Sequence, residues 1–314
     1  MKAVVTGGAG FIGSHLCHAL LDQGLHVTAF DNMETGREEN LAGLRARRGF
    51  TFIKGDVMDL PAVKAALAGA DWALHIAGLA DVIPSILRPD RYLMVNVMGT
   101  LNVLQAAREA GVSRVIYTAS SSCYGAADRF PTAEDAPLRP MSPYALSKIM
   151  GEQMAFHWWK SYGLACVSLR LFNVYGPRLR AGGAYSSVFG VFLTQKAHGR
   201  PLTVVGDGSQ TRDFVHAADV AEAFLAAARS DAAGEAFNIG SGVQSSVSAL
   251  AGLIGGPVVR LAKRAGEPEH SWADIAKAGK LLGWRPKISL EQGVGQMLER
   301  LEDWRGAAPV EAKE

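Results

Sequence analysis

The segment that most constrains the fold is a glycine-rich loop at residues 7–13, Gly-Gly-Ala-Gly-Phe-Ile-Gly. It follows residues 2–6, an apolar run that predicts a β-strand, and it leads into residues 11–21, whose apolar side chains recur at helical spacing. Glycines at such a junction allow a phosphate to approach bare backbone N–H groups and the positive end of the helix. The loop therefore predicts a pyrophosphate site, and a simple tight turn is the alternative.

An acidic residue favours the pyrophosphate interpretation. A second predicted strand, residues 26–30, is followed directly by Asp31, where a carboxylate can bind the hydroxyls of an adenosine ribose. Its charge also repels a 2′-phosphate, so the sequence favours NAD over NADP. After a third predicted strand, residues 51–54, the Gly-Asp-Val segment at 55–57 either contacts the adenine or forms a turn, and both interpretations stay open.

Strands and helices alternate through the first half of the chain. Further strands are predicted at 72–76, 114–118 and 165–169, and helices near 62–67, 92–110 and 143–162. Parallel strands joined by helices predict an α/β fold with a doubly wound parallel sheet of the Rossmann type. We assign residues 1–175 and about 217–240 to this domain. Residues 176–216 and 241–314 form a smaller, interleaved C-terminal substrate-binding domain, in which a helix is expected at 187–197 and a mixed helical tail at 250–301.

Composition and charge exclude several classes of protein. The 314 residues are 48% hydrophobic and 20% charged, as expected for a folded core. The three cysteines are far apart and lack a CxxC motif, so neither disulfides nor a metal site is expected. The 32 basic and 30 acidic residues are spread evenly, which disfavours nucleic-acid binding. The longest uncharged stretch, 236–259, is too polar for a membrane span, and the absence of an export signal predicts a cytoplasmic protein.

Three polar residues form a candidate catalytic set. Tyr144 and Lys148 are four residues apart in a predicted helix, so they share one face, and a nearby ammonium favours the phenolate form of tyrosine. A Tyr-x-x-x-Lys pair alone occurs by chance in many helices. Ser120, however, follows the strand at 114–118, at the sheet edge where ligands bind in open α/β folds. We therefore predict Ser120, Tyr144 and Lys148 as catalytic residues.

A series of motifs extends this pattern along the chain. They are TGGAGFIGS (6–14), DN (31–32), GDV (55–57), HIAG (75–78), NVMGT (96–100), SSSCYG (120–125), SPYALSK (142–148), LFNVYGPR (171–178) and TRDFVH (211–216). With them, the whole chain resembles the extended short-chain dehydrogenase/reductases, specifically the nucleotide-sugar 4-epimerases. The resemblance implies that the catalytic set acts on the 4-hydroxyl of a UDP-sugar, while NAD takes a hydride from C4 and returns it to the opposite face. It also implies a homodimer formed through the helices near 92–110 and 143–162.

The resemblance assigns further contacts residue by residue. Cofactor contacts fall on Gly7, Gly10, Phe11, Ile12, Gly13, Asp31, Asn32, Asp56, Val57, Ala77, Gly78, Asn96, Tyr144, Lys148 and Val174. Substrate contacts fall on Ser85, Ser120, Ser122, Tyr144, Asn173, Tyr185, Val188, Thr203, Val205, Arg212, Arg264, Glu267 and Ser271. Among these, the backbone at Thr203 and Val205 is expected to contact uracil, Arg212 and Arg264 the diphosphate, and Glu267 the uridine ribose.

Departures from related enzymes bear on the reaction and the sugar. Ser121 and Ser122 stand where the related 4,6-dehydratases and decarboxylases carry acidic residues, which favours plain epimerisation. Ser271 stands where galactose-only epimerases have tyrosine, and a small side chain leaves room for an N-acetyl group at C2. The sequence therefore leans to UDP-GlcNAc and UDP-GalNAc as well as UDP-Glc and UDP-Gal. The alternative for Ser271 is a cap for a helix beginning near Ala273. Ala80 is a second departure, because some galactose epimerases have lysine at this position.

Two rival functions stay open. One is another nucleotide-sugar enzyme of the same superfamily, such as a UDP-glucuronate 4-epimerase or a reductase. The other is a catalytically inactive sensor that binds NAD, because a fold does not fix a function. The complete Ser120, Tyr144 and Lys148 set argues against the second.

Overall fold

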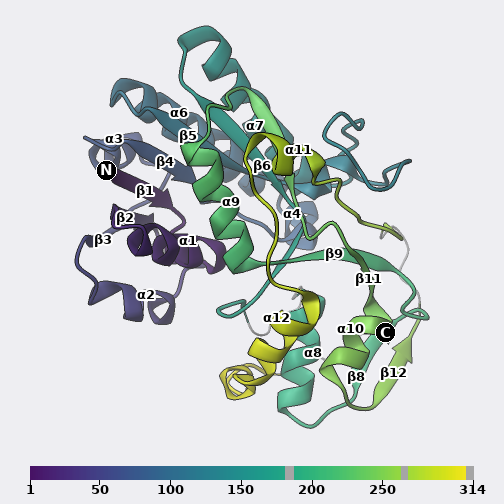
Figure 1. The fold of residues 1–314 in the computed structure, drawn as a ribbon. Helices are drawn as coiled ribbons and strands as arrows, with labels where there is room; N and C mark the ends of the chain where they lie inside the picture. Colours follow the sequence, from purple (N-terminus) through teal and green to yellow (C-terminus); the bar gives the residue numbers. More distant parts are fainter. Residues whose placement is uncertain (181–186, 263–267, 309–314) are drawn as a thin grey trace.

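The computed structural model describes residues 1–180, 187–262 and 268–308 (Figure 1). Within these ranges, seven strands form one sheet in the order β10-β6-β5-β4-β1-β2-β3, and every neighbouring pair is parallel. The strands are β1 (Lys2–Thr6), β2 (His26–Asp31), β3 (Phe50–Lys54), β4 (Trp72–His75), β5 (Arg114–Ser120), β6 (Cys166–Leu171) and β10 (Glu235–Ile239). The predicted doubly wound parallel sheet is confirmed.

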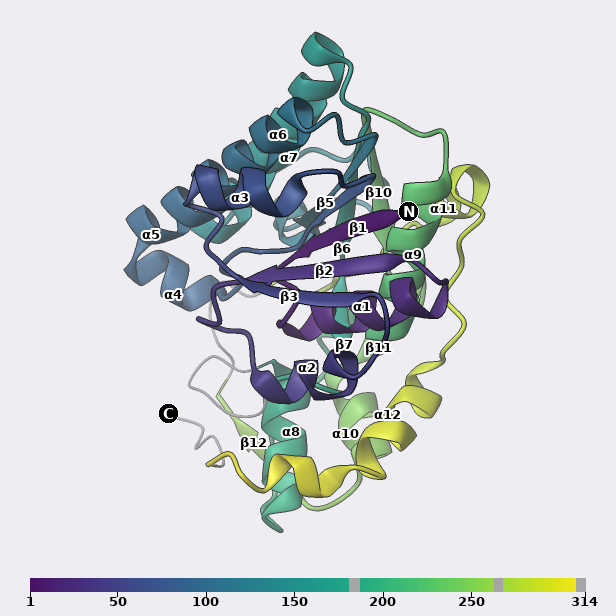
Figure 2. The ribbon, with the colours of Figure 1, turned by 90° about the vertical axis from the view of Figure 1, so that its left-hand side faces the viewer.

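Helices cover both faces of this sheet (Figure 2). On one face lie α1 (Phe11–Asp22) and α9 (Ala217–Arg229), whose Leu16 and Phe224 are fully buried in one core cluster. On the other lie α3 (Leu60–Leu67), α6 (Gly99–Glu109) and α7 (Pro143–Tyr162), with Val103 and Ala155 in a second cluster. The central strands are therefore buried on both faces, as their nearly continuous apolar runs require. The sequence analysis did not identify α2 (Glu38–Arg45).

The helix predicted at 92–110 is in fact a composite. It begins with the last residues of α5 (Pro89–Leu93), continues through one π-helical turn at Met94–Met98, and then becomes α6 from Gly99; the short helix α4 (Val82–Leu87) precedes it. The Thr100 hydroxyl donates to the Asn96 carbonyl at 2.6 Å within this wider turn. Such π turns are rare and often occur at functional sites. Hydrophobic periodicity does not distinguish this arrangement from one continuous helix.

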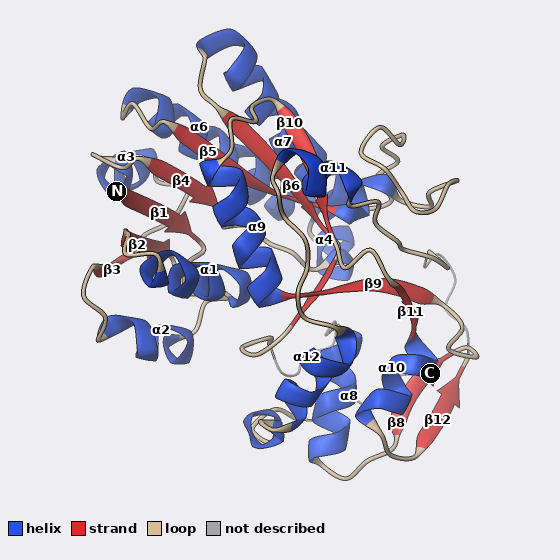
Figure 3. Ribbon diagram, in the orientation of Figure 1, coloured by secondary structure: helices blue, strands red, loops and turns tan. Residues whose placement is uncertain are grey.

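The second domain has its own small sheets and core (Figure 3). One sheet contains β7 (Asn173–Tyr175), β9 (Thr211–His216) and β11 (Gln244–Ser246), and the other pairs β8 (Leu202–Val205) with β12 (Val258–Leu261). Its helices are α8 (Val188–Ala197), α10 (Val247–Ile254) and α12 (Leu290–Leu298). Phe189, Phe192 and Leu250 are among its buried residues.

The expected helical tail at 250–301 is wrong in part. This stretch contains strand β12, and α11 (Ala276–Leu281) lies against β10 of the large sheet, where Ala278 and Trp284 join the first core cluster. Within the described ranges, no helix is long and apolar enough to cross a membrane.

Candidate active site

A cavity of about 350 Å³ lies at the carboxyl ends of the parallel strands. It is lined by the glycine loop, by residues after β2, β3 and β4, and by the end of β5. Ser120, Tyr144 and Lys148 all line it, although they come from a strand end and a helix more than twenty residues further along. Open α/β sheets bind their ligands at this edge. The structure thus brings the predicted catalytic set and the predicted cofactor loop into one cavity.

The glycine loop requires its glycines. Gly7 has a φ of +70°, and a Cβ there would stand 2.8 Å from the Ala77 nitrogen. At Gly13 a Cβ would stand 2.0 Å from the Gly7 carbonyl oxygen, so any side chain would force the turn open. Because α1 starts at Phe11, its unpaired N–H groups begin where this compact turn meets the cavity.

Asp31 is the last residue of β2 rather than the residue after it. One carboxylate oxygen accepts from the Ala9 N–H at 3.0 Å and the other from the Met33 N–H at 2.8 Å. Burial raises the pKa of this carboxyl, and the two backbone hydrogen bonds lower it. Asp31 therefore fixes the glycine loop, and each oxygen retains a lone pair that can accept from a ribose hydroxyl.

The segment at 55–57 forms a turn that lines the cavity, and its contact with adenine stays a prediction. A Cβ at Gly55 would stand 2.4 Å from the Phe30 ring, so the turn needs glycine. Asp56 and Val57 also line the cavity. Asp56 accepts from the Asn32 side-chain amide at 2.9 Å, which joins the ends of β2 and β3.

The Ser120 hydroxyl is held in place by hydrogen bonds from Ser122. Its oxygen accepts from the Ser122 hydroxyl at 2.9 Å and from the Ser122 N–H at 3.2 Å. The Tyr144 phenol forms a side-chain hydrogen bond with Ser120. Since both acceptor positions of Ser120 are engaged by Ser122, its O–H remains available to donate to Tyr144 or to a bound hydroxyl.

Lys148 is buried and fixed by the neighbouring strand. Its ammonium donates to the Thr118 carbonyl at 2.9 Å, and burial lowers its pKa to about 8, so it stays mostly protonated at neutral pH. For Tyr144, burial raises the pKa of the phenol and the hydrogen bond with Ser120 lowers it. Burial and the hydrogen bond with Ser120 are therefore the two largest influences on the pKa of Tyr144 in this structure, and the predicted influence of the Lys148 ammonium stays a prediction.

Asn96, predicted to contact the cofactor, supports the cavity wall instead of lining it. Its side chain accepts from the Leu79 N–H at 2.8 Å and donates to the Leu79 carbonyl at 3.0 Å. It also donates to the Ser147 hydroxyl on α7 at 2.9 Å. Asn96 therefore couples the loop after β4 to α7. The other predicted cofactor residues all line the cavity.

The predicted substrate residues are more dispersed in the structure than the predicted cofactor residues. Of those described, only Ser120 and Tyr144 line the cavity. Ser85 is buried in α4, where its hydroxyl donates to the Val82 carbonyl at 2.5 Å. The second domain carries Asn173, Val188, Thr203, Val205, Arg212 and Ser271. The remaining predicted residues, Tyr185, Arg264 and Glu267, lie outside the described residues.

Two predicted substrate residues have partners within the chain. The Thr203 N–H donates to the Gln195 side-chain oxygen at 3.0 Å, so this part of the backbone expected to contact uracil is already engaged. Arg212 donates to the Thr211 carbonyl at 2.8 Å.

The helix-cap alternative for Ser271 is wrong. Helix α11 begins at Ala276 and its N-cap is Ile275, four residues after Ser271. The Ser271 N–H instead donates to the Thr211 carbonyl at 3.2 Å, which joins the segment to β9.

The cavity also contains residues that the sequence analysis did not name. They include Glu34, Thr35, Arg37, Asn40, Leu79, Asp81, Val95, Thr118, Phe172, Arg178 and Arg180. The loop after β2 folds back because the Arg37 N–H and the Asn40 amide both donate to the Ala9 carbonyl. The one sequence feature that could have indicated that this loop lines the cavity is its position directly after Asp31.

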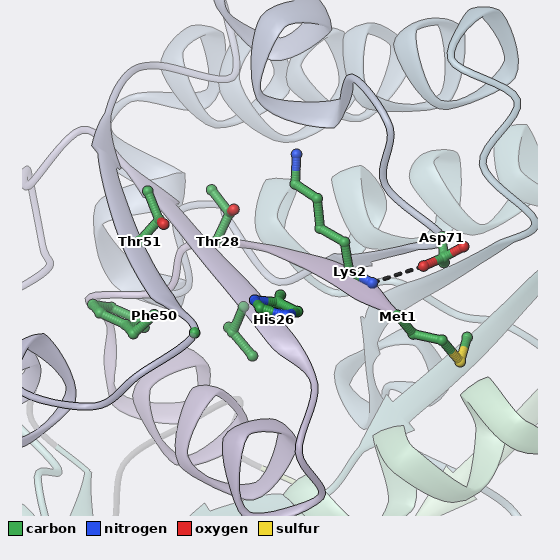
Figure 4. A pocket seen from close by; sticks show the side chains of 9 residues that line it. Met1, Lys2, His26, Thr28, Phe50, Thr51 and Asp71 are labelled. Atoms are coloured by element: carbon green, nitrogen blue, oxygen red, sulfur yellow. Dashed lines mark hydrogen bonds between the residues drawn. The ribbon is translucent and has the colours of Figure 1, made fainter.

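A second cavity, of about 560 Å³, lies at the opposite edge of the sheet (Figure 4). It is formed at the amino ends of β1, β2 and β3, where the Lys2 N–H donates to the Asp71 carboxylate at 2.7 Å. None of the predicted site residues lines it, so the carboxyl edge holds the candidate active site.

These features together define an enzyme of the extended short-chain dehydrogenase/reductase class: the parallel sheet, the glycine loop, Asp31 at the end of β2, and the set of Ser120, Tyr144 and Lys148. More specifically, the chain belongs to the NAD dependent epimerase/dehydratase family, whose model matches residues 3–240. This confirms the predicted family and its cofactor, NAD.

The similar proteins and solved structures are named for different sugars. A UDP-glucose 4-epimerase of Mycolicibacterium smegmatis is 37% identical, over 95% of this chain and 98% of the relative. The structure of a UDP-N-acetylglucosamine 4-epimerase from Methanobrevibacter ruminantium is 33% identical, with a TM-score of 0.89 over 95% of this chain and 98% of the other. A UDP-glucuronic acid 4-epimerase from Bacillus cereus, solved with its substrate and NAD, is 32% identical, with a TM-score of 0.88 over 96% and 99%.

Proposed function

We propose that this enzyme is a UDP-sugar 4-epimerase that uses NAD and acts on UDP-GlcNAc and UDP-GalNAc as well as UDP-Glc and UDP-Gal. The observation that carries the proposal is the placement of Ser120, Tyr144 and Lys148 at one end of the dinucleotide cavity. Ser121 and Ser122 provide no carboxylate beside them for elimination or decarboxylation. The similarity to 4-epimerases along nearly the whole chain supports the same reaction.

The residues of the cavity fit NAD. The glycine loop provides a close approach for a pyrophosphate, and Asp31 provides acceptors for a ribose. The Thr118 hydroxyl, buried in the cavity wall, has no hydrogen-bond partner among the described residues, as expected where a ligand supplies one. When bound, NAD would supply a reversible hydride acceptor for C4, and C4 is inverted if the hydride returns to the opposite face of the sugar.

The protein side chains manage the proton of the 4-hydroxyl. Tyr144 accepts this proton as the carbonyl forms and returns it when the carbonyl is reduced. Ser120, whose own oxygen is occupied by Ser122, donates to the reacting oxygen or to Tyr144. Lys148 contributes a fixed positive charge close to the reaction, held by the Thr118 carbonyl.

A panel of UDP-sugars with chromatographic separation of the products tests this proposal. Interconversion of 4-epimers without net consumption of NAD supports it. A reductase would instead oxidise NADH in proportion to product, and a non-catalytic sensor would bind sugar and cofactor without forming product.

The sugar preference rests on Ser271. If this residue borders the C2 substituent, Ser271→Tyr fills the space of an acetamido group, and overpacking typically costs about 1–3 kcal/mol. The catalytic efficiency toward UDP-GlcNAc should then fall by about five- to a hundredfold, with UDP-Glc largely unaffected. The measurement is the ratio of the two efficiencies in wild type, Ser271→Tyr and the control Ser271→Ala. An unchanged ratio in Ser271→Tyr would contradict this assignment.

We further propose that the enzyme is a homodimer formed through α4, the π turn and α7. This face exposes Ile86 and Leu87 of α4, Met94 of the π turn, and Leu146 and Met150 of α7, each at least 40% exposed. Leu146 and Met150 are one helical turn apart, so they form a continuous apolar stripe. An apolar helical face of this kind suits a second copy of the chain, because a two-fold interface uses the same patch on both subunits.

Leu146→Glu should convert this dimer to a monomer, because it places a charge at the centre of an apolar interface. Sedimentation velocity measures the change in mass. Leu281→Glu is the matched control, since Leu281 is 49% exposed on α11, away from this face. A monomeric wild type, or a dimeric Leu146→Glu variant, would refute the proposed interface.

A further inference from the structure

Asp81 is an acidic residue of the cavity wall that the proposed reaction does not use. It lies between β4 and α4, beside Ala80 and Leu79, and all three line the cavity. Its position is fixed from two sides. The buried Tyr92 phenol forms a hydrogen bond with the Asp81 backbone, and Asn96 holds Leu79 through two hydrogen bonds. The side chain itself is exposed to solvent.

The negative charge of Asp81 reaches the reacting end of the cavity. It raises the pKa of the Tyr144 phenol, as it does that of Tyr92. Within the described part of the chain, no ion pair joins Asp81 to a cation. The preceding residue, Ala80, also lines the cavity and carries no charge.

Two of the basic side chains that line the cavity form hydrogen bonds with other groups of the chain. Lys148 donates to the Thr118 carbonyl, and Arg37 donates to the Arg178 carbonyl at 2.8 Å and to Asn40 at 3.4 Å. Arg178 and Arg180 line the cavity as well. Among the described carboxylates that line the cavity, Asp81 is the one whose charge raises the pKa of Tyr144.

We propose that Asp81 makes the sugar site select uncharged hexoses and disfavour hexuronates. This inference rests on the proposed function, because it places the 4-hydroxyl of the sugar within hydrogen-bond reach of Tyr144. The carboxylate of a hexuronate is attached to C5, the neighbour of C4, so it must enter the same end of the cavity. The negative charge of Asp81 repels this carboxylate. The site therefore discriminates against hexuronates without any additional contact to uncharged hexoses.

The expected size follows from Coulomb's law. For like charges about 8 Å apart, an effective dielectric constant between about 20 and 80 corresponds to a two- to thirtyfold change in binding. The fold itself does not distinguish the two sugars, since the Bacillus cereus enzyme solved with UDP-glucuronic acid has a TM-score of 0.88 to this chain. In this proposal, the charge of Asp81 distinguishes the uncharged hexose from the hexuronate.

The test compares UDP-glucose with UDP-glucuronate, which differ only at C6. Wild type should prefer UDP-glucose, and Asp81→Asn should shift the ratio of catalytic efficiencies by about tenfold toward UDP-glucuronate. Asp231→Asn, an exposed aspartate just before β10 at the amino edge of the sheet, is the matched control and should leave the ratio unchanged. Raising the salt concentration should narrow the preference in wild type but not in Asp81→Asn.

Binding provides a second measurement that does not depend on turnover. Titration calorimetry with the same two ligands, on proteins that also carry Tyr144→Phe, should give the same shift in the ratio of Kd values. Asp81→Glu keeps the negative charge and should keep the preference for UDP-glucose. This variant provides a second test if Asp81→Asn does not fold. A preference of wild type for UDP-glucuronate, or a ratio unaffected by Asp81→Asn, overturns the inference. If wild type turns over no UDP-sugar, the proposed function fails, and the calorimetric ratio still decides the role of Asp81.

Discussion

Tyr144→Phe should reduce epimerisation by about a hundredfold to ten-thousandfold, the range typical for loss of a positioned acid or base. The substitution removes one oxygen atom and leaves the ring, so α7 and the cavity wall keep their packing. Because the phenol is the group proposed to accept the 4-hydroxyl proton, the chemical step loses its base. Binding of NAD and of UDP-sugar should remain, since these depend on the glycine loop, Asp31 and the second domain.

The measurements are turnover with UDP-GlcNAc and UDP-Glc, NAD content after denaturation of the purified protein, and UDP-sugar affinity by calorimetry. Tyr162→Phe is the matched control, because Tyr162 ends the same helix and is 46% exposed. Undiminished turnover in Tyr144→Phe would exclude Tyr144 as the base. Loss of NAD together with turnover would instead indicate a binding role.

Arg170→Met should lower the free energy of unfolding by about 3–5 kcal/mol, as expected when one partner of a buried ion pair is removed. The Arg170 guanidinium donates to both carboxylate oxygens of Glu152, at 2.7 and 3.0 Å, and the two side chains are 6% and 2% exposed. It also donates to the Tyr124 hydroxyl and to the Glu134 carbonyl, each at 2.8 Å. Removing it leaves the Glu152 charge buried and unpaired on the helix that carries Tyr144 and Lys148.

Urea unfolding followed by circular dichroism measures this loss. Replacing both partners, Arg170→Met with Glu152→Met, should recover part of the stability because no unpaired charge then remains. Arg45→Met is the control: its partner is Glu38, the two side chains are 48% and 63% exposed, and its loss should be far smaller. Equal losses for Arg170→Met and Arg45→Met would contradict this account of the buried pair.

The local sequence was sufficient to predict the framework of the site. The glycine loop, Asp31 and the Ser120, Tyr144 and Lys148 set all line the cavity. Each lies at the carboxyl end of a strand or in the first turns of a helix. Where strands are parallel, these ends meet at one edge of the sheet, so order along the chain already implies proximity in space.

The second domain was harder to predict because its elements are short and its contacts are distant in sequence. Strand β12 pairs with β8, which lies more than fifty residues earlier, and has no alternating pattern of its own. In the first domain, the helix predicted at 92–110 instead contains a π turn at Met94–Met98, in which the Asn96 side chain accepts from the Leu79 N–H.

The sequence by itself was sufficient to predict the parallel α/β fold, the dinucleotide loop and the proposed catalytic set, because these depend on residue type and spacing within short segments. Only the tertiary structure decided which polar side chains support the site and which line it. Asn96 became a support, Arg170 and Glu152 became a buried pair, and Asp81 became part of the cavity wall. In the sequence Asn96 resembled a cofactor contact, and Arg170, Glu152 and Asp81 resembled ordinary surface residues. The role of each is fixed by partners that folding brings together from other elements, and the pattern of neighbouring residues carries no record of those partners.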